Sequence, residues 1–450
     1  MHRFIFKMGY FLKRPEVIRY YKNFQRTQWD PFESLKKHQN KQLQKLVEFT
    51  HANVPYYMKL FNRLGIKPND ITTVKDLEKL PILTKQTIKE NWQDFIPQNT
   101  NKVKYLNGST GGSTGIPLKY RMSVCDYERG VGLLYRGWGY GGYKLGDKIA
   151  VIAGSSLIPN LRSESRRKIQ DLFLNCRHYS SFKMSEKKLF KYFYNINNWK
   201  PYFIRGYASS IYLFAKFIQE NNLKLEFQLK AIFSTAEKLF DKQRELIEQV
   251  LGVKVFDNYG LNDGGISAYE CERHIGMHID MERAILETVS DENKQVFNQE
   301  GRILATSLYN YALPFIRYDT GDLGILSDLE CACGRKTPLL KEIVGRVSEF
   351  ITTVSGLKIH GEFFSHIFYE IDNISQFQVI QDKMDEILIK IVPDNLQTKE
   401  DIDVIKIKDI IRKKDADLKV RIQFISEGEI EQTKAGKYKF IINNLNQAIL

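Results

Sequence analysis

Short apolar segments alternate with amphipathic segments through the middle of this 450-residue chain. Apolar runs bounded by Gly or polar residues predict buried strands, whereas apolar residues that recur every three or four positions predict helices. The predicted strands cover residues 148–156, 202–207, 229–237 and 253–260, and the predicted helices cover 185–199, 210–221 and 242–252. Strands that take turns with helices form a largely parallel sheet with helices on both faces, and such sheets bind ligands at the carboxyl ends of their strands.

The pattern changes after about residue 346. Helices and strands of a different order are predicted there, at residues 361–371, 377–381, 386–392, 399–413 and 418–425. A unit of about 100 residues is a usual size for a small domain. We therefore expect an α/β protein with a large N-terminal domain, residues 1–346, whose mixed or parallel sheets are flanked by helices, and a small α+β C-terminal domain, residues 347–450.

The composition is that of an ordinary globular protein, with 43% hydrophobic and 27% charged residues. It excludes a disordered chain, a collagen-like chain and a small disulfide framework. The 67 basic residues exceed the 53 acidic ones by 14, so an anionic partner is a candidate. Basic residues alternate with acidic ones and form no long Lys/Arg tract, so we expect no nucleic acid partner.

The five cysteines, an odd number in a long chain, argue against a disulfide framework and for a reducing compartment, so we expect a cytoplasmic protein. Lys7, Lys13 and Arg14 interrupt the apolar N-terminal segment. No small-residue cleavage site follows it, and no segment elsewhere reaches about 18 uninterrupted apolar residues, so we expect no transmembrane segment. The N-terminal segment predicts an amphipathic helix that either packs on the protein body, the more common arrangement, or makes peripheral contact with anionic lipid.

The most distinctive local sequence is the glycine-rich segment from Asn107 to Pro117. Its glycines let backbone N–H groups approach a ligand closely, and its Ser and Thr hydroxyls add donors, a combination suited to phosphate. No Lys stands at the position that the Walker motif requires. Taken alone, the segment is also compatible with a flexible surface linker.

The segment from Ser109 to Pro117 resembles the phosphate-binding loop of the adenylate-forming superfamily of acyl-CoA synthetases, adenylation domains and luciferases. Five further segments resemble motifs of that superfamily and follow in the same order: Ser234 to Lys238, Tyr259 to Asp263, Tyr318 to Leu323, Gly345-Arg346 and Thr433 to Lys437. Each motif is weak alone, but six in one order are hard to attribute to chance. Three other segments resemble the phenylacetate-CoA ligase branch, which includes homologues encoded in capsular polysaccharide clusters: residues 43–66, residues 205–217 and Cys331 to Arg335.

The resemblance implies a mobile C-terminal domain and a two-step reaction of an AMP-forming acid–thiol ligase. A carboxylic acid and ATP, with Mg²⁺, give an acyl-adenylate and pyrophosphate, and coenzyme A or a carrier thiol then takes the acyl group. The resemblance makes Lys437 the catalytic cation between carboxylate and α-phosphate, where two anions meet and their repulsion must be offset. Lys434 and Lys439 are neighbouring competitors, and an exposed Lys in a Lys-rich tail is the alternative for Lys437.

The resemblance also implies the nucleotide-binding residues. Asp322 would accept hydrogen bonds from the ribose hydroxyls, Arg346 would contact the nucleotide from the hinge, and Tyr259 would border the adenine. The full predicted ATP-binding set is Ser109, Thr110, Gly111, Gly112, Ser113, Thr114, Gly115, Ala236, Glu237, Asn258, Tyr259, Gly260, Asp322 and Arg346. Asp263 stands where the superfamily has a Glu associated with Mg²⁺, an ion that prefers hard oxygen ligands.

Four residues depart from the superfamily pattern, and one of them is Leu118, which follows Pro117 where many relatives have Lys. Asn262 replaces the usual Ser or Thr and Asp263 replaces the usual Glu, and both changes bear on the geometry of a bound metal. Ser348 occupies a position where the hinge often has Asp or Lys, which bears on rotation between the domains.

A second group of candidate ligands consists of thiols and imidazoles. Cys271 is followed by His274 and His278, and Cys331 and Cys333 form a second pair. Four such soft ligands match a closed tetrahedral Cys₃His zinc site. The predicted structural zinc ligands are Cys271, His278, Cys331 and Cys333, and the choice between the two histidines stays open. The alternative is Cys in apolar packing beside a solvated His.

The sequence does not identify the acid. We expect its pocket between residues 206–209 and the loop near Tyr259, and the 12% aromatic content is compatible with an aryl acid. One alternative is adenylation followed by transfer to an amine or a sugar in polysaccharide biosynthesis, and another is nucleotidyl transfer without a thioester. A third, outside enzymes, is a zinc-stapled module that binds an anionic polymer. A homodimer is left open.

Overall fold

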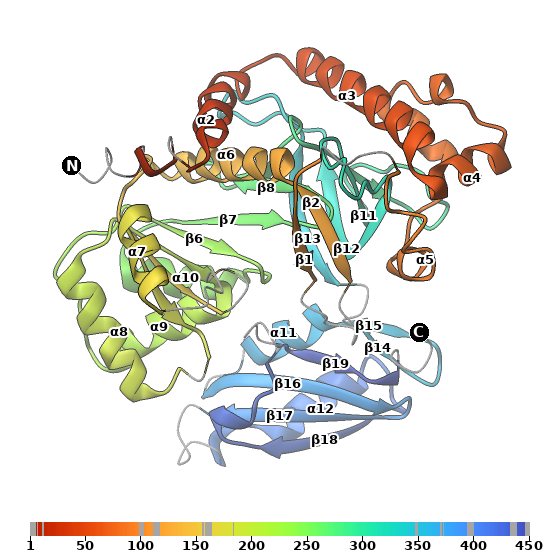
Figure 1. Cartoon of the computed structure of the whole chain (residues 1–450). Helices are drawn as coiled ribbons and strands as arrows, with labels where there is room; N and C mark the ends of the chain where they lie inside the picture. The colour runs from red at the N-terminus through yellow and green to blue at the C-terminus, as the bar shows by residue number, and fades with distance from the viewer. Residues whose placement is uncertain are drawn as a thin grey trace.

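The structure, a computed structural model, describes residues 6, 8–10, 13–98, 103–110, 118–154, 157, 164–182, 184–346, 350–369, 371, 373–393, 400–432 and 439–445. Within them the chain forms one large mixed sheet with helices on both faces, a β-hairpin, and a smaller C-terminal sheet with helices of its own (Figure 1). The predicted fold class, a large α/β part followed by a small α+β part, is confirmed.

The large sheet has eleven strands in the described part of the chain, in the order β10-β11-β12-β13-β9-β8-β7-β6-β5-β3-β4. Its parallel part consists of β3 (Ile149–Ala153), β4 (Cys176–Ser180), β5 (Phe203–Tyr207), β6 (Ala231–Thr235) and β7 (Val255–Gly260). All of these except β4 lie in segments predicted as strands. Their registers place Arg205 of β5, Phe233 of β6 and Phe256 of β7 in one lateral row.

Helices cover one face of the parallel part. They are α8 (Glu186–Trp199), α9 (Ala208–Glu220) and α10 (Asp241–Leu251). The apolar sides of α8, α9 and α10 share a core with Ile152, Ile204 and Ile232 of the strands. Helix α10 ends before Gly252, whose φ of 70° is left-handed and therefore favours glycine.

The opposite face of the parallel part is covered by α6 (Val124–Tyr140). Its Tyr135 and Trp138 pack in one core cluster with Phe203 and Phe233 of the sheet. Helix α7 (Glu164–Leu174) lies on the same face as α6, where its Leu174 packs against this cluster. Two N-terminal helices, α2 (Pro15–Thr27) and α3 (Phe32–Asn53), lie farther out, and α2 runs beside α6 (Figure 1). The described N-terminal segment therefore packs on the protein body, as one of the two expectations has it.

The other half of the large sheet is antiparallel, so the expectation of a largely parallel sheet holds only as far as β7. Its strands are β8 (Ser267–Glu270), β9 (Met277–Ile279), β10 (Ala284–Val289), β11 (Glu300–Ser307), β12 (Tyr318–Ser327) and β13 (Leu339–Arg346). Short connections without crossover helices join consecutive strands here, which antiparallel pairing permits and parallel pairing does not. A separate antiparallel hairpin consists of β1 (Tyr105–Ser109) and β2 (Lys119–Ser123). In the sequence it follows α4 (Pro55–Leu64) and α5 (Lys85–Glu90).

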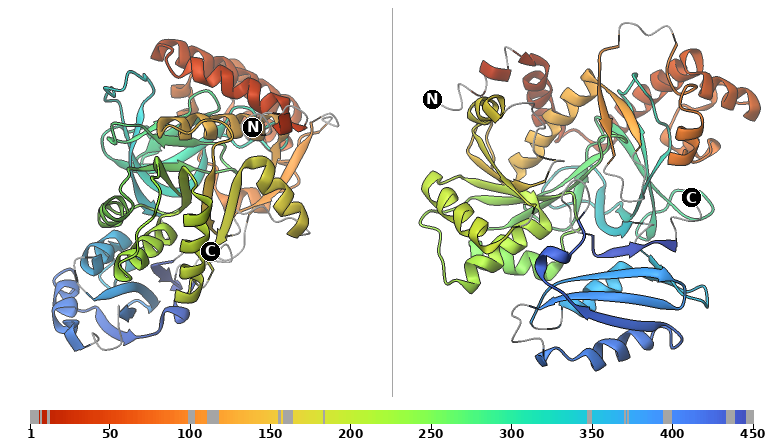
Figure 2. Two further views of the ribbon diagram at one scale, coloured as in Figure 1. Left: turned by 90° about the vertical axis from the view of Figure 1, so that its left-hand side faces the viewer. Right: turned by 60° about the horizontal axis from the view of Figure 1, so that its bottom comes forward.

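The C-terminal part has a separate four-stranded sheet, seen below the large sheet in both figures (Figures 1 and 2). Its elements are β14 (Phe350–Thr352), β15 (Lys358–His360), α11 (Gly361–Tyr369), β16 (Ile374–Lys383), β17 (Glu386–Pro393), α12 (Val404–Arg412), β18 (Lys419–Phe424) and β19 (Ile441–Asn443), with the sheet order β18-β17-β16-β19. It has its own apolar core. None of the helices in the described ranges combines the length and the apolar character that crossing a membrane requires.

Candidate active site

The glycine-rich segment is the connection between β1 and β2. Backbone N–H of Thr110 donates to the carbonyl of Leu118 at 2.9 Å, and the N–H of Leu118 donates to Oγ1 of Thr110 at 2.9 Å. These two bonds close the base of the hairpin, directly after Ser109 at the end of β1. The predicted phosphate-loop residues between them, Gly111, Gly112, Ser113, Thr114 and Gly115, lie outside the described residues.

Two further predicted nucleotide residues follow the carboxyl end of β6. Ala236 has a φ of 71°, a left-handed conformation that is uncommon for a residue with a Cβ and that tends to occur at functional sites. The next residue, Glu237, accepts a hydrogen bond at 3.0 Å on Oε2 from the backbone N–H of Ser209, which lies at the start of α9 after β5. This bond joins the carboxyl ends of two neighbouring parallel strands, where ligands of such sheets bind.

Three predicted residues from distant segments meet at Asp322. The hydroxyl of Tyr259 donates to Oδ2 of Asp322 at 2.8 Å, and Nε of Arg346 lies 3.3 Å from Oδ1. Asp322 and Arg346 are lateral partners on β12 and β13. Burial, and then the charge of Asp322, raise the pKa of Tyr259 well above its usual value, so its hydroxyl remains a donor. The Asp322 carboxylate keeps lone pairs that can accept from hydroxyl groups of a ligand.

The turn that presents Asp322 is held by its own side chains. Gly321 has a φ of 79°, a conformation that favours glycine. Its N–H donates to Oδ1 of Asp319 at 2.9 Å, and the N–H of Asp322 donates to Oγ1 of Thr320 at 3.1 Å. The backbone of the Thr-Gly-Asp segment is thus fixed before any ligand binds.

The predicted magnesium residue, Asp263, is buried and accepts a hydrogen bond on Oδ2 from the hydroxyl of Tyr318 at 2.7 Å. Tyr318 is the first residue of the same motif that contains Asp322, and the sequence did not single it out as a partner of Asp263. The motif Tyr-x-Thr-Gly-Asp, which begins with Tyr318, is the sequence signal that could have pointed to this residue. One oxygen of Asp263 is engaged by a protein donor, and its other oxygen is the one that can face a cation.

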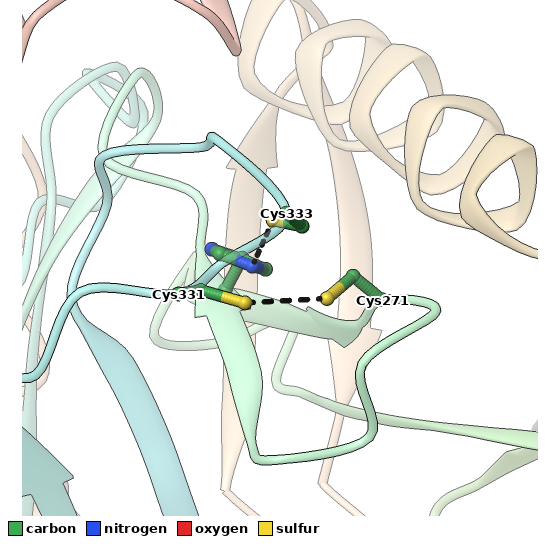
Figure 3. A group of neighbouring side chains, drawn as sticks. Cys271, Cys331 and Cys333 are labelled. Carbon is green, nitrogen blue, oxygen red and sulfur yellow. Dashed lines mark hydrogen bonds between the residues drawn. The ribbon is translucent and has the colours of Figure 1, made fainter.

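The thiols and one imidazole of the predicted zinc site come together. Sγ of Cys271 lies 3.7 Å from Sγ of Cys331, and Sγ of Cys333 lies 3.2 Å from Nε2 of His278 (Figure 3). One ligand atom from each of the four residues lies within 4.8 Å of the others. The other histidine, His274, is not in this group, and its Nδ1 lies 3.2 Å from Oε2 of Glu270.

This geometry fits a tetrahedral metal ion. A disulfide requires about 2.05 Å between sulfurs, whereas two thiolates on one zinc, each about 2.3 Å from the metal, lie about 3.8 Å apart. Nδ1 of His278 lies 3.0 Å from Oγ1 of Thr337, a contact that orients the ring and leaves Nε2 for a metal. Burial, and then the nearby charge of Arg335, lower the pKa of His278 to about 4, so the imidazole is neutral, as a ligand must be.

Some residues singled out in the sequence lie outside the described residues, and one described residue near these sites was given no role. The catalytic candidate Lys437 falls in 433–438, and Ser348 falls in 347–349, both ranges beyond the described residues. Lys238, which follows Glu237, lies 3.3 Å from Oε1 of Glu342 on β13. Lys238 is the last residue of the segment Ser234 to Lys238 that resembles a superfamily motif, but the sequence analysis gave it no role of its own.

Among known proteins, the chain is similar to a CapK protein and to phenylacetate-coenzyme A ligases. Residues 351–444 match the family described as the CapK C-terminal domain. The chain is 26% identical over 447 residues to protein CapK of Staphylococcus aureus, covering 97% of this chain and 94% of that protein. It is 28% identical to a phenylacetate-coenzyme A ligase of Pseudomonas putida, covering 67% and 70% of the two chains, and 23% identical to one of Thermus thermophilus, covering 73% and 74%.

Solved structures show the same fold. A 2-hydroxyisobutyryl-CoA ligase in the postadenylation state, in complex with R3-HIB-AMP, has a TM-score of 0.73 and 18% identity, with 94% of this chain and 93% of that chain covered. The same ligase with 2-HIB-AMP and CoA in the thioesterification state has a TM-score of 0.61. At this identity the similarity concerns the fold.

Proposed function

We propose that this chain, which belongs to the adenylate-forming ligase superfamily and to its phenylacetate-CoA ligase and CapK-like branch, activates a carboxylic acid with ATP and passes the acyl group to coenzyme A or a carrier thiol. In the first step a carboxylate oxygen attacks the α-phosphorus, an acyl–phosphate bond forms, and the bond to pyrophosphate breaks. In the second step a thiolate sulfur attacks the acyl carbon and AMP leaves.

The observation that carries the proposal is the junction of Tyr259, Asp322 and Arg346. These residues come from three segments that are far apart in sequence and belong to three different motifs of the superfamily resemblance. A buried carboxylate with one neutral donor and one cation beside it can hold a ribose diol, because its remaining lone pairs accept from two hydroxyls. We assign this role to Asp322.

The difficult step brings two anions together. Two unit charges about 4 Å apart interact by about 4 kcal/mol at an effective dielectric constant near 20, which corresponds to orders of magnitude in rate. A preorganised cation offsets this repulsion in the transition state. We assign that cation to Lys437 and the triphosphate to the backbone amides of Gly111 to Gly115. In the same proposal residues 1–346 bind ATP and the acid, and residues 347–450 form a mobile domain that brings Lys437 to them.

Two metals complete the proposal. The free oxygen of Asp263 is the candidate ligand of Mg²⁺, which would neutralise charge on the ATP phosphates when bound. Cys271, His278, Cys331 and Cys333 would hold a structural zinc ion. That ion would fix the turn between β8 and β9 against the connection between β12 and β13, at the end of the β12–β13 ladder opposite to Asp322 and Arg346.

Exchange of labelled pyrophosphate into ATP, measured with a panel of acids, tests the proposal. We expect acid-dependent exchange in the parent, thioester formation once coenzyme A is added, and a KM for ATP that rises about 10-fold to 100-fold in Asp322→Asn, as for loss of hydrogen bonds to a charged group. Asp328→Asn is the matched control, because Asp328 is exposed just beyond the end of the same strand. An unchanged KM for ATP in Asp322→Asn would remove Asp322 from the nucleotide site.

The same assay distinguishes a thiol acceptor from an amine or a sugar acceptor. The match of residues 351–444 to the CapK C-terminal domain family favours comparing thiols with other nucleophiles. Exchange of pyrophosphate without thioester formation, followed by product formation with an amine or a sugar, would favour transfer to that nucleophile. Exchange with no transfer to any of these acceptors would favour nucleotidyl transfer alone.

A further inference from the structure

Arg205 occupies an unusual position for a charged residue. It lies on β5, between β3 and β6 in the interior of the large sheet, and its side chain shares the α6 face with Phe203 and Tyr207. The residue is partly exposed although its strand neighbours are buried. Arg205 lies two residues before the carboxyl end of its strand, the edge of the sheet at which ligands of such sheets bind.

The guanidinium of Arg205 has no partner of opposite charge among the described residues. Its Nε is buried without a hydrogen-bond partner, and its guanidinium carbon lies 4.9 Å from the centre of the Trp138 ring. Burial lowers the pKa of Arg205, and the ionisable groups that act on it in the other direction are the hydroxyls of Tyr269, Tyr135 and Tyr207 rather than carboxylates.

The other buried arginines of this half of the molecule behave differently. Arg136 pairs with Asp280 and Glu282, and Arg283 pairs with Asp126 at 2.7 Å. A buried charge without a partner is costly, so a ligand that supplies the counter-charge would be favoured at such a position.

Within the described part of the chain, two more polar atoms on the same face are buried without hydrogen-bond partners. They are Nε1 of Trp138, beneath the Arg205 guanidinium, and Oδ1 of Asn258 on β7. The strand registers place Asn258 in the lateral row of Tyr207, two residues beyond Arg205 toward the carboxyl ends and therefore on the same face of the sheet. Arg205 and Trp138 both offer N–H donors there, and aromatic rings surround them. Donors with a positive charge inside an aromatic enclosure suit an oxyanion carried on an apolar group.

We propose that Arg205 and Trp138 bind a second anionic group of the acid, at the end remote from the carboxylate that is adenylated, so that the substrate class is dicarboxylic acids. This inference rests on the proposed function, because Arg205 directly precedes residues 206–209, where the acid pocket is expected. A neutral acid of the same shape leaves the guanidinium unpaired and is therefore disfavoured.

Matched acids test the proposal. Phenylacetate is compared with 4-carboxyphenylacetate, and butyrate with succinate, by pyrophosphate exchange in the parent, Arg205→Met, Arg205→Lys and Arg177→Met. Arg177 is the control, because it also stacks on a tryptophan, 4.8 Å from the Trp199 ring, but is exposed on the edge strand β4. We expect the parent to prefer the dianionic acid at least about tenfold in kcat/KM. Arg205→Met should lose that preference, Arg205→Lys should keep part of it, and Arg177→Met should keep all of it.

A preference for the neutral acids in the parent, or an unchanged preference in Arg205→Met, would overturn the proposal. If the parent activates no acid, the proposed function fails, and thermal unfolding with succinate then decides the inference alone. A rise in Tm with succinate in the parent and in Arg177→Met, but not in Arg205→Met or only weakly in Arg205→Lys, supports an anion site at Arg205. Equal shifts in all four proteins, or none, exclude it.

Discussion

At the scale of single residues, the interior of the large sheet holds ionisable groups whose proton affinity depends on folding. Asp257 on β7, one residue before Asn258, is the clearest case. Burial, and then the nearby charge of Glu270, raise the pKa of Asp257 to about 7. An aspartate in an unfolded chain titrates near 4, so the folded protein holds this proton more tightly than the unfolded chain does.

The sign of the resulting pH dependence follows from linkage. The stability contributed by the protonated Asp257 is fully present below about pH 4 and is lost as the pH rises to about 7. The parent should lose this stability between pH 5 and pH 8, whereas Asp257→Asn cannot titrate and should keep its own. The free energy of unfolding of Asp257→Asn, relative to that of the parent, should therefore rise by about 2 kcal/mol over this range, since one pKa unit corresponds to about 1.4 kcal/mol. Urea unfolding at both pH values measures the difference. An equal difference at the two pH values would contradict the assignment.

At the scale of elements, the close approach of α6 to β8 depends on one glycine. A Cβ at Gly137 would lie 2.2 Å from ring atoms of Tyr269, whereas a Cβ at Gly139 of the same helix would meet only the end of the Gln25 side chain at 3.5 Å. We expect Gly137→Ala to destabilise the protein by about 1 to 3 kcal/mol through overpacking. Gly139→Ala should be neutral or stabilising by up to about 1 kcal/mol, because alanine is the better helix former. Equal free energies of unfolding for the two variants would show that α6 and β8 can separate freely.

The proposed zinc ion acts at the same scale, because it would join two connections between strands. We expect about one equivalent of zinc in the purified protein, and a lower Tm after Cys331→Ser or after treatment with a chelator. Cys125→Ser is the matched control, since Cys125 is exposed and lies outside the cluster. Less than about half an equivalent of zinc by elemental analysis, or an unchanged Tm in Cys331→Ser, would reject the metal site.

At the scale of the whole molecule, two sheets with separate cores share one proposed reaction. The rings of Phe240 and Phe440, one from each part, lie 5.8 Å apart, so the C-terminal part contacts the region that follows β6. The proposal needs the same C-terminal part to bring Lys437 to the nucleotide. The rate of the proposed reaction therefore depends on both parts of the molecule.

Replacement of Lys437 by Ala should lower the rate of adenylation by about 10²-fold or more, as for the loss of a preorganised transition-state donor. Lys434→Ala and Lys439→Ala, at the neighbouring lysines, should have much smaller effects. Single-turnover formation of the acyl-adenylate gives the rate of the chemical step directly. A Lys437→Ala enzyme that forms adenylate at nearly the parent rate would assign the cation to another residue.

The sequence by itself predicted most strands of the parallel half of the fold, the resemblance to a superfamily and the group of candidate ligands. Segments such as β3 and β6 could be predicted because a run of apolar residues reports burial locally, and the ordered motifs could be recognised without any contact being known. The antiparallel half was not predicted, because antiparallel partners are set by register and turn geometry rather than by an alternation with helices.

Only the tertiary structure decided which polar groups meet. It placed His278, not His274, beside the cysteines and joined Tyr318 to Asp263. Among the described residues it also gave Arg136 a carboxylate partner but gave none to Arg205. Cys271 and Cys331 are 60 positions apart in the chain, yet their sulfurs are neighbours. Periodicity describes the environment of one segment, whereas the pairing of charges and ligands depends on distances between segments, and those distances exist only after the chain has folded.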